Sequence, residues 1–151
     1  MRSFITGLCL LFAASAASAA GHSSTYIVKE GTLSVADTVA KLEAAIEAAP
    51  PKLMAKIDHG SNAVKAEMEL NESVLLILGA PKVGTPIMQA NPMAGLELPV
   101  KILIWNDNGQ TKIGYLNPTE LNARFELDGK ADKQLGMMNK VLDMLTNAGM
   151  M

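Results

Sequence analysis

Hydrophobic and polar residues alternate near the start of this chain and then recur with helical spacing. Residues 25–31 alternate, with Tyr26 and Val28 on one face and Ile27 and Lys29 on the other, which predicts a half-buried strand. A helix is expected next, capped by Ser34 with Asp37 at its third position and ended by Pro50–Pro51. Its apolar stripe consists of Val35, Val39, Leu42 and Ile46.

The middle of the chain predicts two more strands with a short helix between them. Leu53, Ala55 and Ile57 share one face of a strand that is expected to end at Asp58–His59. A helix is expected over residues 61–70 and a strand over residues 73–78. Because this third strand is apolar on both faces, we expect it to lie centrally in a sheet, with cover on each side.

The segment after Gly79 predicts a short helix inside a long connection. Thr85 suits the N-cap and Pro86 the first helical position, so residues 87–90 are expected to be helical. Pro92 and Gly95 would then turn the chain back towards a fourth strand over residues 98–106.

The last part of the chain predicts a hairpin followed by two helices. Asn108–Gly109 favours the positive φ values of a type I′ turn between the fourth strand and the alternating residues 111–116. Asn117–Pro118 with Glu120 predicts a helix to about Arg124. The stripe of a final helix is Leu135, Met138, Leu142 and Leu145.

This order of elements predicts an α+β domain. We expect an antiparallel-rich sheet of about five strands with helices packed on one face. With 49% hydrophobic residues but one Trp, two Tyr and three Phe, the core is expected to be aliphatic. No internal repeat or linker is visible, so residues 25–148 are expected to form a single domain.

The first residues predict export. Residues 1–19 hold one charge, Arg2, then an apolar run and Ala17–Ser18–Ala19, which is typical of a secretory signal peptide. The apolar run is shorter than a membrane helix needs. We therefore expect cleavage near Ala19–Ala20 and a flexible segment 20–24. The mature protein is expected to be periplasmic or secreted, without stable membrane insertion.

Charge and cysteine content argue against a nucleic-acid partner and against a disulfide in the mature chain. The one cysteine, Cys9, lies in the leader, so the mature chain would have no disulfide. Loss of Arg2 would leave 12 of the 13 basic residues against 15 acidic ones, a net charge of −3 instead of −2. Basic residues are scattered singly, so we expect no nucleic-acid partner.

Several motifs together resemble the domain of unknown function family 302. They are Asp58–His59, the run LLILGAPKVGTPIMQANPMAGLELP, the strand KILIW ending at Trp105, Tyr115, Asn117–Pro118 and Arg124. The resemblance implies a curved, TATA-binding-protein-like sheet, a homodimer, and a pocket on the uncovered face of the sheet. It implies no activity and no cofactor. Phe125 stands where family members commonly carry a histidine, which argues against a site that uses that histidine.

Asp58 and His59 form the histidine–carboxylate neighbour pair of the mature chain. The functional interpretation is an acid–base pair. The structural interpretation is that one of them hydrogen-bonds the start of the next helix at Ser61, and it is favoured because neighbouring strand residues point to opposite faces.

The glycine-rich segment 79–86 and the methionines are the other candidates. Lys82 could hold an anion at the start of the following helix, but Pro86 lacks the backbone N–H that would donate a hydrogen bond to this anion. We therefore favour the interpretation that the segment forms an apolar surface, which closes a pocket or a dimer contact. Ten methionines suggest Cu(I), whereas their positions suggest core packing. Met88 and Met93 are the displayed pair, for which a groove-lining role is favoured.

One metal hypothesis depends on the processing site. Cleavage after Ala19 would place His22 third in the mature chain, where amine, amide and imidazole nitrogens suit Cu(II) or Ni(II). Cleavage one residue later removes this arrangement.

Three functions stay open at this point. The first is an exported, non-enzymatic module for a small apolar or amphipathic ligand. The second is a cofactor-independent enzyme that uses His59 and Asp58, with Lys82 or Arg124 holding an anionic substrate. The third is an accessory role as a partner subunit of an exported complex, and a periplasmic copper-related binding protein is a further alternative. The candidate ligand-binding residues are Asp58, His59, Lys82, Thr85, Met88, Met93, Trp105 and Arg124.

Overall fold

The computed structural model describes residues 25–151. The predicted leader, the segment 20–24 and His22 lie outside these residues. Within residues 25–151, no helix has both the length and the hydrophobicity to cross a membrane.

Five strands form one antiparallel sheet in the order β1-β5-β4-β3-β2. The strands are β1 (Tyr26–Gly31), β2 (Lys52–Asp58), β3 (Ser73–Gly79), β4 (Val100–Asp107) and β5 (Gln110–Leu116). The predicted hairpin between β4 and β5 is confirmed, because Asn108 and Gly109 have φ values of 53° and 94°.

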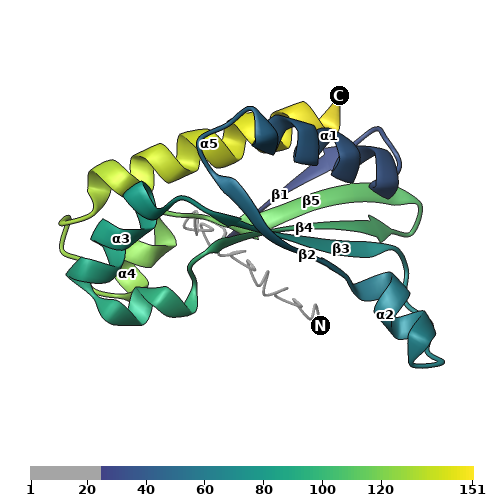
Figure 1. The fold of residues 1–151 in the computed structure, drawn as a ribbon, viewed down its shortest axis with the longest axis horizontal. Helices are drawn as coiled ribbons and strands as arrows, with labels where there is room; N and C mark the ends of the chain where they lie inside the picture. Colours follow the sequence, from purple (N-terminus) through teal and green to yellow (C-terminus); the bar gives the residue numbers. More distant parts are fainter. Residues whose placement is uncertain (1–24) are drawn as a thin grey trace, which may run out of the picture.

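Helices pack on one face of this sheet, which confirms the predicted α+β fold. They are α1 (Val35–Glu47), α2 (His59–Lys65), α3 (Pro81–Ala90), α4 (Glu120–Arg124) and α5 (Asp132–Met150), with a 3-10 helix η1 (Pro92–Leu96). Figure 1 shows α1 and α5 side by side over the sheet, α3 and α4 at one end, and α2 projecting from the other end.

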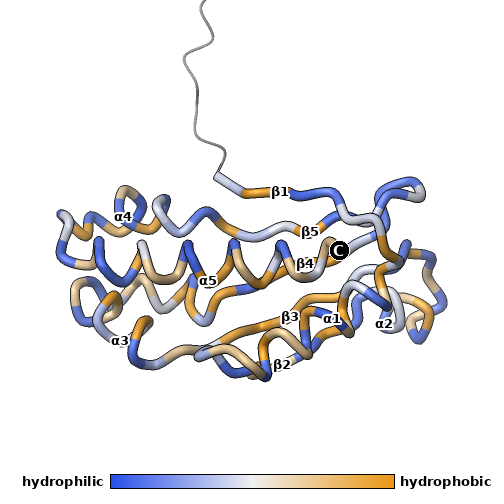
Figure 2. Tube along the Cα trace, turned by 90° about the horizontal axis from the view of Figure 1, so that it is seen from above, coloured by the Kyte–Doolittle hydropathy of each residue, from blue (hydrophilic) through white to orange (hydrophobic). Residues whose placement is uncertain are grey.

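The core lies between the sheet and the two long helices. The predicted stripes of α1 and α5 are both buried, and they pack against buried residues of the strands: Leu76, Ile102, Ile104 and Ile113. Figure 2 shows hydrophobic colour along β3 and an alternation of hydrophilic and hydrophobic positions along α5. Gly149 permits the close approach of the two helices, because a Cβ there would lie 2.8 Å from Leu42 Cγ.

The predicted cover on both faces of β3 is wrong for the part of the chain that the structure describes. The strand is internal, between β4 and β2. Val74, Leu76 and Leu78 are buried beneath the helices, whereas Leu75 and Ile77 on the other face are half-buried. An apolar strand can therefore leave one face partly open, and this face is called the open face below.

The predicted common face of Leu53, Ala55 and Ile57 is also wrong. Leu53 pairs with Leu78 and Ala55 with Ile77, so β2 advances by two residues while β3 advances by one. Met54 is the extra residue of this β-bulge. Periodicity alone gives no sign of such an insertion.

Several predicted boundaries shift. The helix expected over residues 61–70 begins at His59 and ends at Lys65, and Glu67 has a φ of 58°. The helix expected to start at Pro86 starts at Pro81, with Pro86 inside it and without a cap from Thr85. Pro81 takes the first helical position instead, because the Ala80 carbonyl already accepts from the N–H groups of Val83 and Gly84. The fourth strand starts at Val100, two residues later than expected.

Candidate functional site

An apolar cavity of about 400 Å³ lies between α3, α5, the end of β3 and the start of β2. Its walls come from four parts of the chain. The lining residues are Pro50, Pro51, Met54, Leu78, Gly79, Ala80, Pro81, Val83, Gly84, Thr85, Met88, Leu98, Pro99, Val100, Met137, Met138, Val141, Leu142 and Leu145.

The lining carries no charged side chain, and Thr85 is its one polar side chain. Such a cavity cannot position a substrate by ion pairs or stabilise a charged transition state from within, because both need fixed polar groups. It can enclose an apolar group, since transfer from water into an apolar setting is favourable.

Four methionines from three elements meet at this cavity. They are Met54 on β2, Met88 on α3, and Met137 and Met138 on α5. Gly79 makes room for the first, because a Cβ at Gly79 would lie 3.0 Å from Met54 Sδ. Unbranched thioether side chains adapt to ligands of different shape, so this wall suits a variable apolar guest.

The structure divides the predicted site residues among several places. Thr85 and Met88 line the cavity, and Lys82 lies between the lining residues Pro81 and Val83. Met93 lies on η1, is 58% exposed and does not line the cavity, so the two methionines of the predicted pair do not share one wall.

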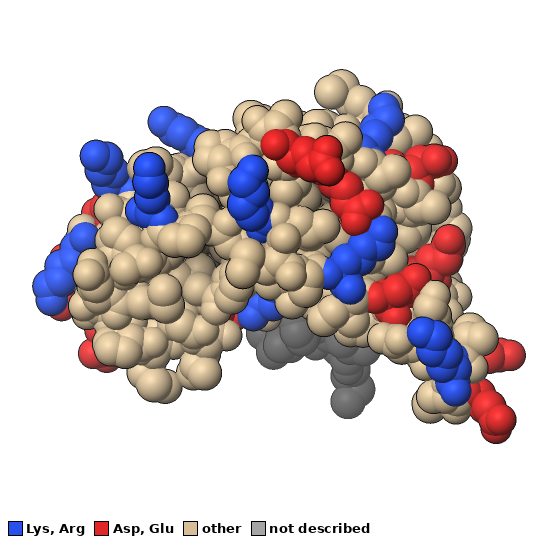
Figure 3. Space-filling model, in the orientation of Figure 1, with Lys and Arg blue, Asp and Glu red and all other residues tan. Residues whose placement is uncertain are grey.

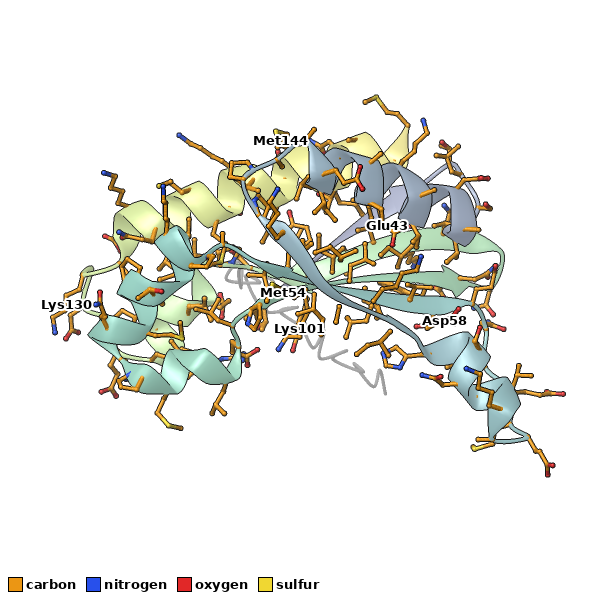
Figure 4. All side chains as sticks on the ribbon, in the orientation of Figure 1. Glu43, Met54, Asp58, Lys101, Lys130 and Met144 are labelled. Atoms are coloured by element: carbon orange, nitrogen blue, oxygen red, sulfur yellow. The ribbon has the colours of Figure 1, made fainter. Side chains whose placement is uncertain are left out.

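Asp58 lies at the other end of β2 from this cavity and caps α2. Its Oδ1 accepts from the Ser61 backbone N–H and its Oδ2 from the Ser61 hydroxyl, each at 2.8 Å. These two hydrogen bonds hold the pKa of Asp58 below its usual range. The structural interpretation of Asp58 is thus confirmed. Figure 4 shows Met54 and Asp58 at different places along β2.

His59 does not receive a carboxylate partner from Asp58. It is half-buried as the first residue of α2, while both Asp58 oxygens face Ser61. Residues 25–151 hold no group of three or more His, Cys, Asp and Glu side chains that could bind a metal ion.

Arg124 belongs to a small ion-pair network. Its Nη1 lies 2.5 Å from Glu97 Oε1, and Lys101 Nζ lies 3.6 Å from Glu97 Oε2. The Arg124 guanidinium therefore already has an anionic partner within the protein.

Trp105 lies on the open face of the sheet, at a second hollow of about 440 Å³. A Cβ at Gly114 would lie 3.0 Å from the Trp105 ring, so the glycine lets the indole lie across β5. Glu97 and Lys101 belong to the lining of this hollow together with Tyr26 and Val28, and it shares Val100, Met138 and Leu142 with the first cavity. Because charged groups border it, the first cavity is the better candidate for an apolar ligand.

Sequence reasoning did not identify the contributions of β2 and α5 to the cavity. Met54 enters the wall through the bulge, which has no sequence signature here. Met137 and Val141 lie beside the buried stripe of α5, and Met137 is 46% exposed. Apolar residues that widen a helical stripe were the available signal for an additional apolar surface.

Comparison with known proteins identifies relatives of this chain. A family model described as domain of unknown function DUF302 matches residues 26–145. A crystal structure of an uncharacterized conserved DUF302 protein from Bacillus stearothermophilus superposes with a TM-score of 0.74, covering 82% of this chain and 97% of that one at 18% identity.

Two curated relatives are longer proteins. They are named fluoride-specific ion channel FluC 1, from Brucella suis biovar 1 (strain 1330) and Brucella abortus biovar 1 (strain 9-941). Each is 30% identical over 116 residues, 76% of this chain. The match spans 46% of the first and 43% of the second, less than half of either relative.

Proposed function

Since the chain belongs to the DUF302 family, whose description supplies no activity, we propose from the cavity that it is a non-enzymatic binding module for a small apolar or amphipathic molecule. The observation that carries this proposal is a cavity of about 400 Å³ without a charged lining residue. Ligand pockets commonly measure 300–1,000 Å³ and are mostly apolar, so both size and lining fit.

The proposal includes export. It is supported by the sequence of residues 1–19, with its single charge, apolar run and Ala17–Ser18–Ala19. Intact mass of the mature protein tests it. A mass that begins near Ala20 supports export, and a full-length mass from the cytosol contradicts it.

Ion-channel activity is not part of the proposal. The relatives that bear that name are matched over less than half of their length. Catalysis by Asp58 and His59 as an acid–base pair is not part of the proposal either. Both carboxylate oxygens of Asp58 accept hydrogen bonds from Ser61, and neither is paired with His59.

Native mass spectrometry of protein purified from its own compartment is the first experiment. The expected result is a species heavier than the mature chain by one small molecule, released on denaturation. Unliganded mass together with no thermal shift across a panel of lipids and apolar metabolites would contradict the proposal.

A pair of matched variants places the ligand. Gly84→Leu adds a side chain to the cavity wall, where a Cβ meets Leu98 Cδ1 at 3.7 Å, an ordinary contact. Gly136→Leu adds the same side chain to α5 outside the cavity, where nothing lies within 4 Å of a Cβ. We expect the first variant to stay folded and lose the ligand, and the second to keep it. Equal amounts of bound ligand in both variants would show that this cavity is not the binding site.

A second candidate, Cu(I) binding, is favoured by the four cavity methionines, because soft thioethers select this ion. Met88→Leu with Met137→Leu separates the two functions. An apolar ligand should still bind this double variant, because Leu and Met have similar volume. Cu(I) binding should be lost. If wild-type protein takes up no Cu(I) from a competing chelator, this candidate is excluded.

A further inference from the structure

Four lysines stand next to lining residues of the cavity. Lys82 lies between Pro81 and Val83 on α3, and Lys52 follows Pro51 at the start of β2. On α5, Lys133 precedes Met137 by four residues and Lys140 follows it by three, so both are neighbours of this cavity residue on the helix surface.

These four lysines are exposed and have no ion-pair partner within residues 25–151. Five other lysines have partners in the same part of the chain: Lys29, Lys56, Lys101, Lys112 and Lys130. Lys41 on α1 and Lys65 on α2 also lack an ion-pair partner there, so four of the six unpaired lysines lie beside the cavity.

The acidic residue Asp143 of helix α5 is already paired. Its Oδ1 lies 2.5 Å from Lys29 Nζ of β1. Lys133 and Lys140 lie one turn to either side of Met137, which borders the cavity. Figure 3 shows Lys and Arg side chains over the α5 and α3 side of the molecule, while most Asp and Glu side chains on this face lie near α1 and α2.

We propose that the ligand is an anionic amphiphile, with an aliphatic tail in the cavity and a carboxylate or phosphate head among Lys52, Lys82, Lys133 and Lys140. This inference rests on the proposed binding function. The head stays outside because burial of a charge among apolar residues is very costly. The lysines reach it because their aliphatic stems can lie along apolar surface while their ammonium groups stay in water.

The test compares ligands of one chain length and different heads. Dodecanoate and dodecyl phosphate should bind the wild-type protein about tenfold more tightly than dodecanol, because several weak, exposed ion pairs act together. Dodecylamine should bind most weakly. The preference should shrink at high salt, which screens exposed charges. The ratio between dodecanoate and dodecyl phosphate identifies the head group.

A matched pair of double variants locates the charge effect. Lys82→Gln with Lys140→Gln should lower dodecanoate affinity to that of dodecanol and leave dodecanol unchanged. Lys41→Gln with Lys65→Gln removes the same charge from exposed lysines of α1 and α2 and should change neither.

Two results would overturn the inference. If dodecanol binds wild-type protein as tightly as dodecanoate, the anionic head is excluded while the proposed apolar binding function stands. If none of the four ligands binds wild-type protein and native mass spectrometry shows no bound molecule, the proposed function falls as well.

Discussion

The two ends of the β2–β3 pair use their residues in opposite ways. At the end that carries α2, the polar groups of Asp58 and Ser61 satisfy each other and fix the start of a helix. At the other end, beside Gly79, apolar side chains from β2, α3 and α5 surround an unfilled space. The comparison shows that Asp58, although it carries a reactive carboxylate, caps a helix. The apolar surface at the other end, which has no such group, leaves a space that could hold a ligand.

The largest expected effect comes from the apolar end. Leu78 lines the cavity and is 2% exposed, so it also belongs to the core. Leu78→Ala should lower the free energy of unfolding by about 2–5 kcal/mol, since it removes buried methyl groups and enlarges the cavity. Urea denaturation measures this. A loss below about 1 kcal/mol would show that the cavity wall is loosely packed.

At the polar end, Asp58→Ala should lower the melting temperature by a few degrees and leave ligand binding unchanged. The variant removes both acceptors of the α2 cap. Asp58→Asn is the control, because asparagine is an equally good N-cap and should restore most of the loss. A fall in ligand affinity with Asp58→Ala would break the division of roles between the two ends.

The same cap should give the protein a pH dependence that the variant lacks. The pKa of Asp58 is lowered in the folded state by its hydrogen bonds to Ser61. Its contribution is therefore complete above the unfolded-state pKa of about 3.9 and is lost as pH falls through the lower, folded value. Melting temperatures of wild type and Asp58→Ala should converge on acidification. A constant difference down to acid pH would contradict this.

The smallest effect is expected for His59→Ala. His59 is half-buried and no hydrogen bond from its side chain is present in the described part of the chain. We expect a stability change below about 1 kcal/mol and unchanged ligand binding. If the variant is as stable as wild type but has lost the ligand or its function in the cell, His59 has a functional role.

The sequence predicted the fold more completely than the site. Helical stripes such as Leu135 to Leu145 and the Asn108–Gly109 turn are local signals, and the structure has both. The cavity depends on the β2 bulge at Met54 and on the placement of Met137 beside α3, which are set by strand register and helix packing. Thr85 and Met88 were found because one segment holds both; their partners lie far away in sequence.

Because Gly114 has no side chain, the ring of Trp105 can lie over it, and the fluorescence of this tryptophan can be used to follow binding. The indole that lies across this glycine belongs to the single tryptophan of the chain, and it is on the open face instead of among the helices. Emission from the native protein thus reports on one side of the sheet. A molecule that covers that side and takes water away from the indole would shift the emission to shorter wavelength.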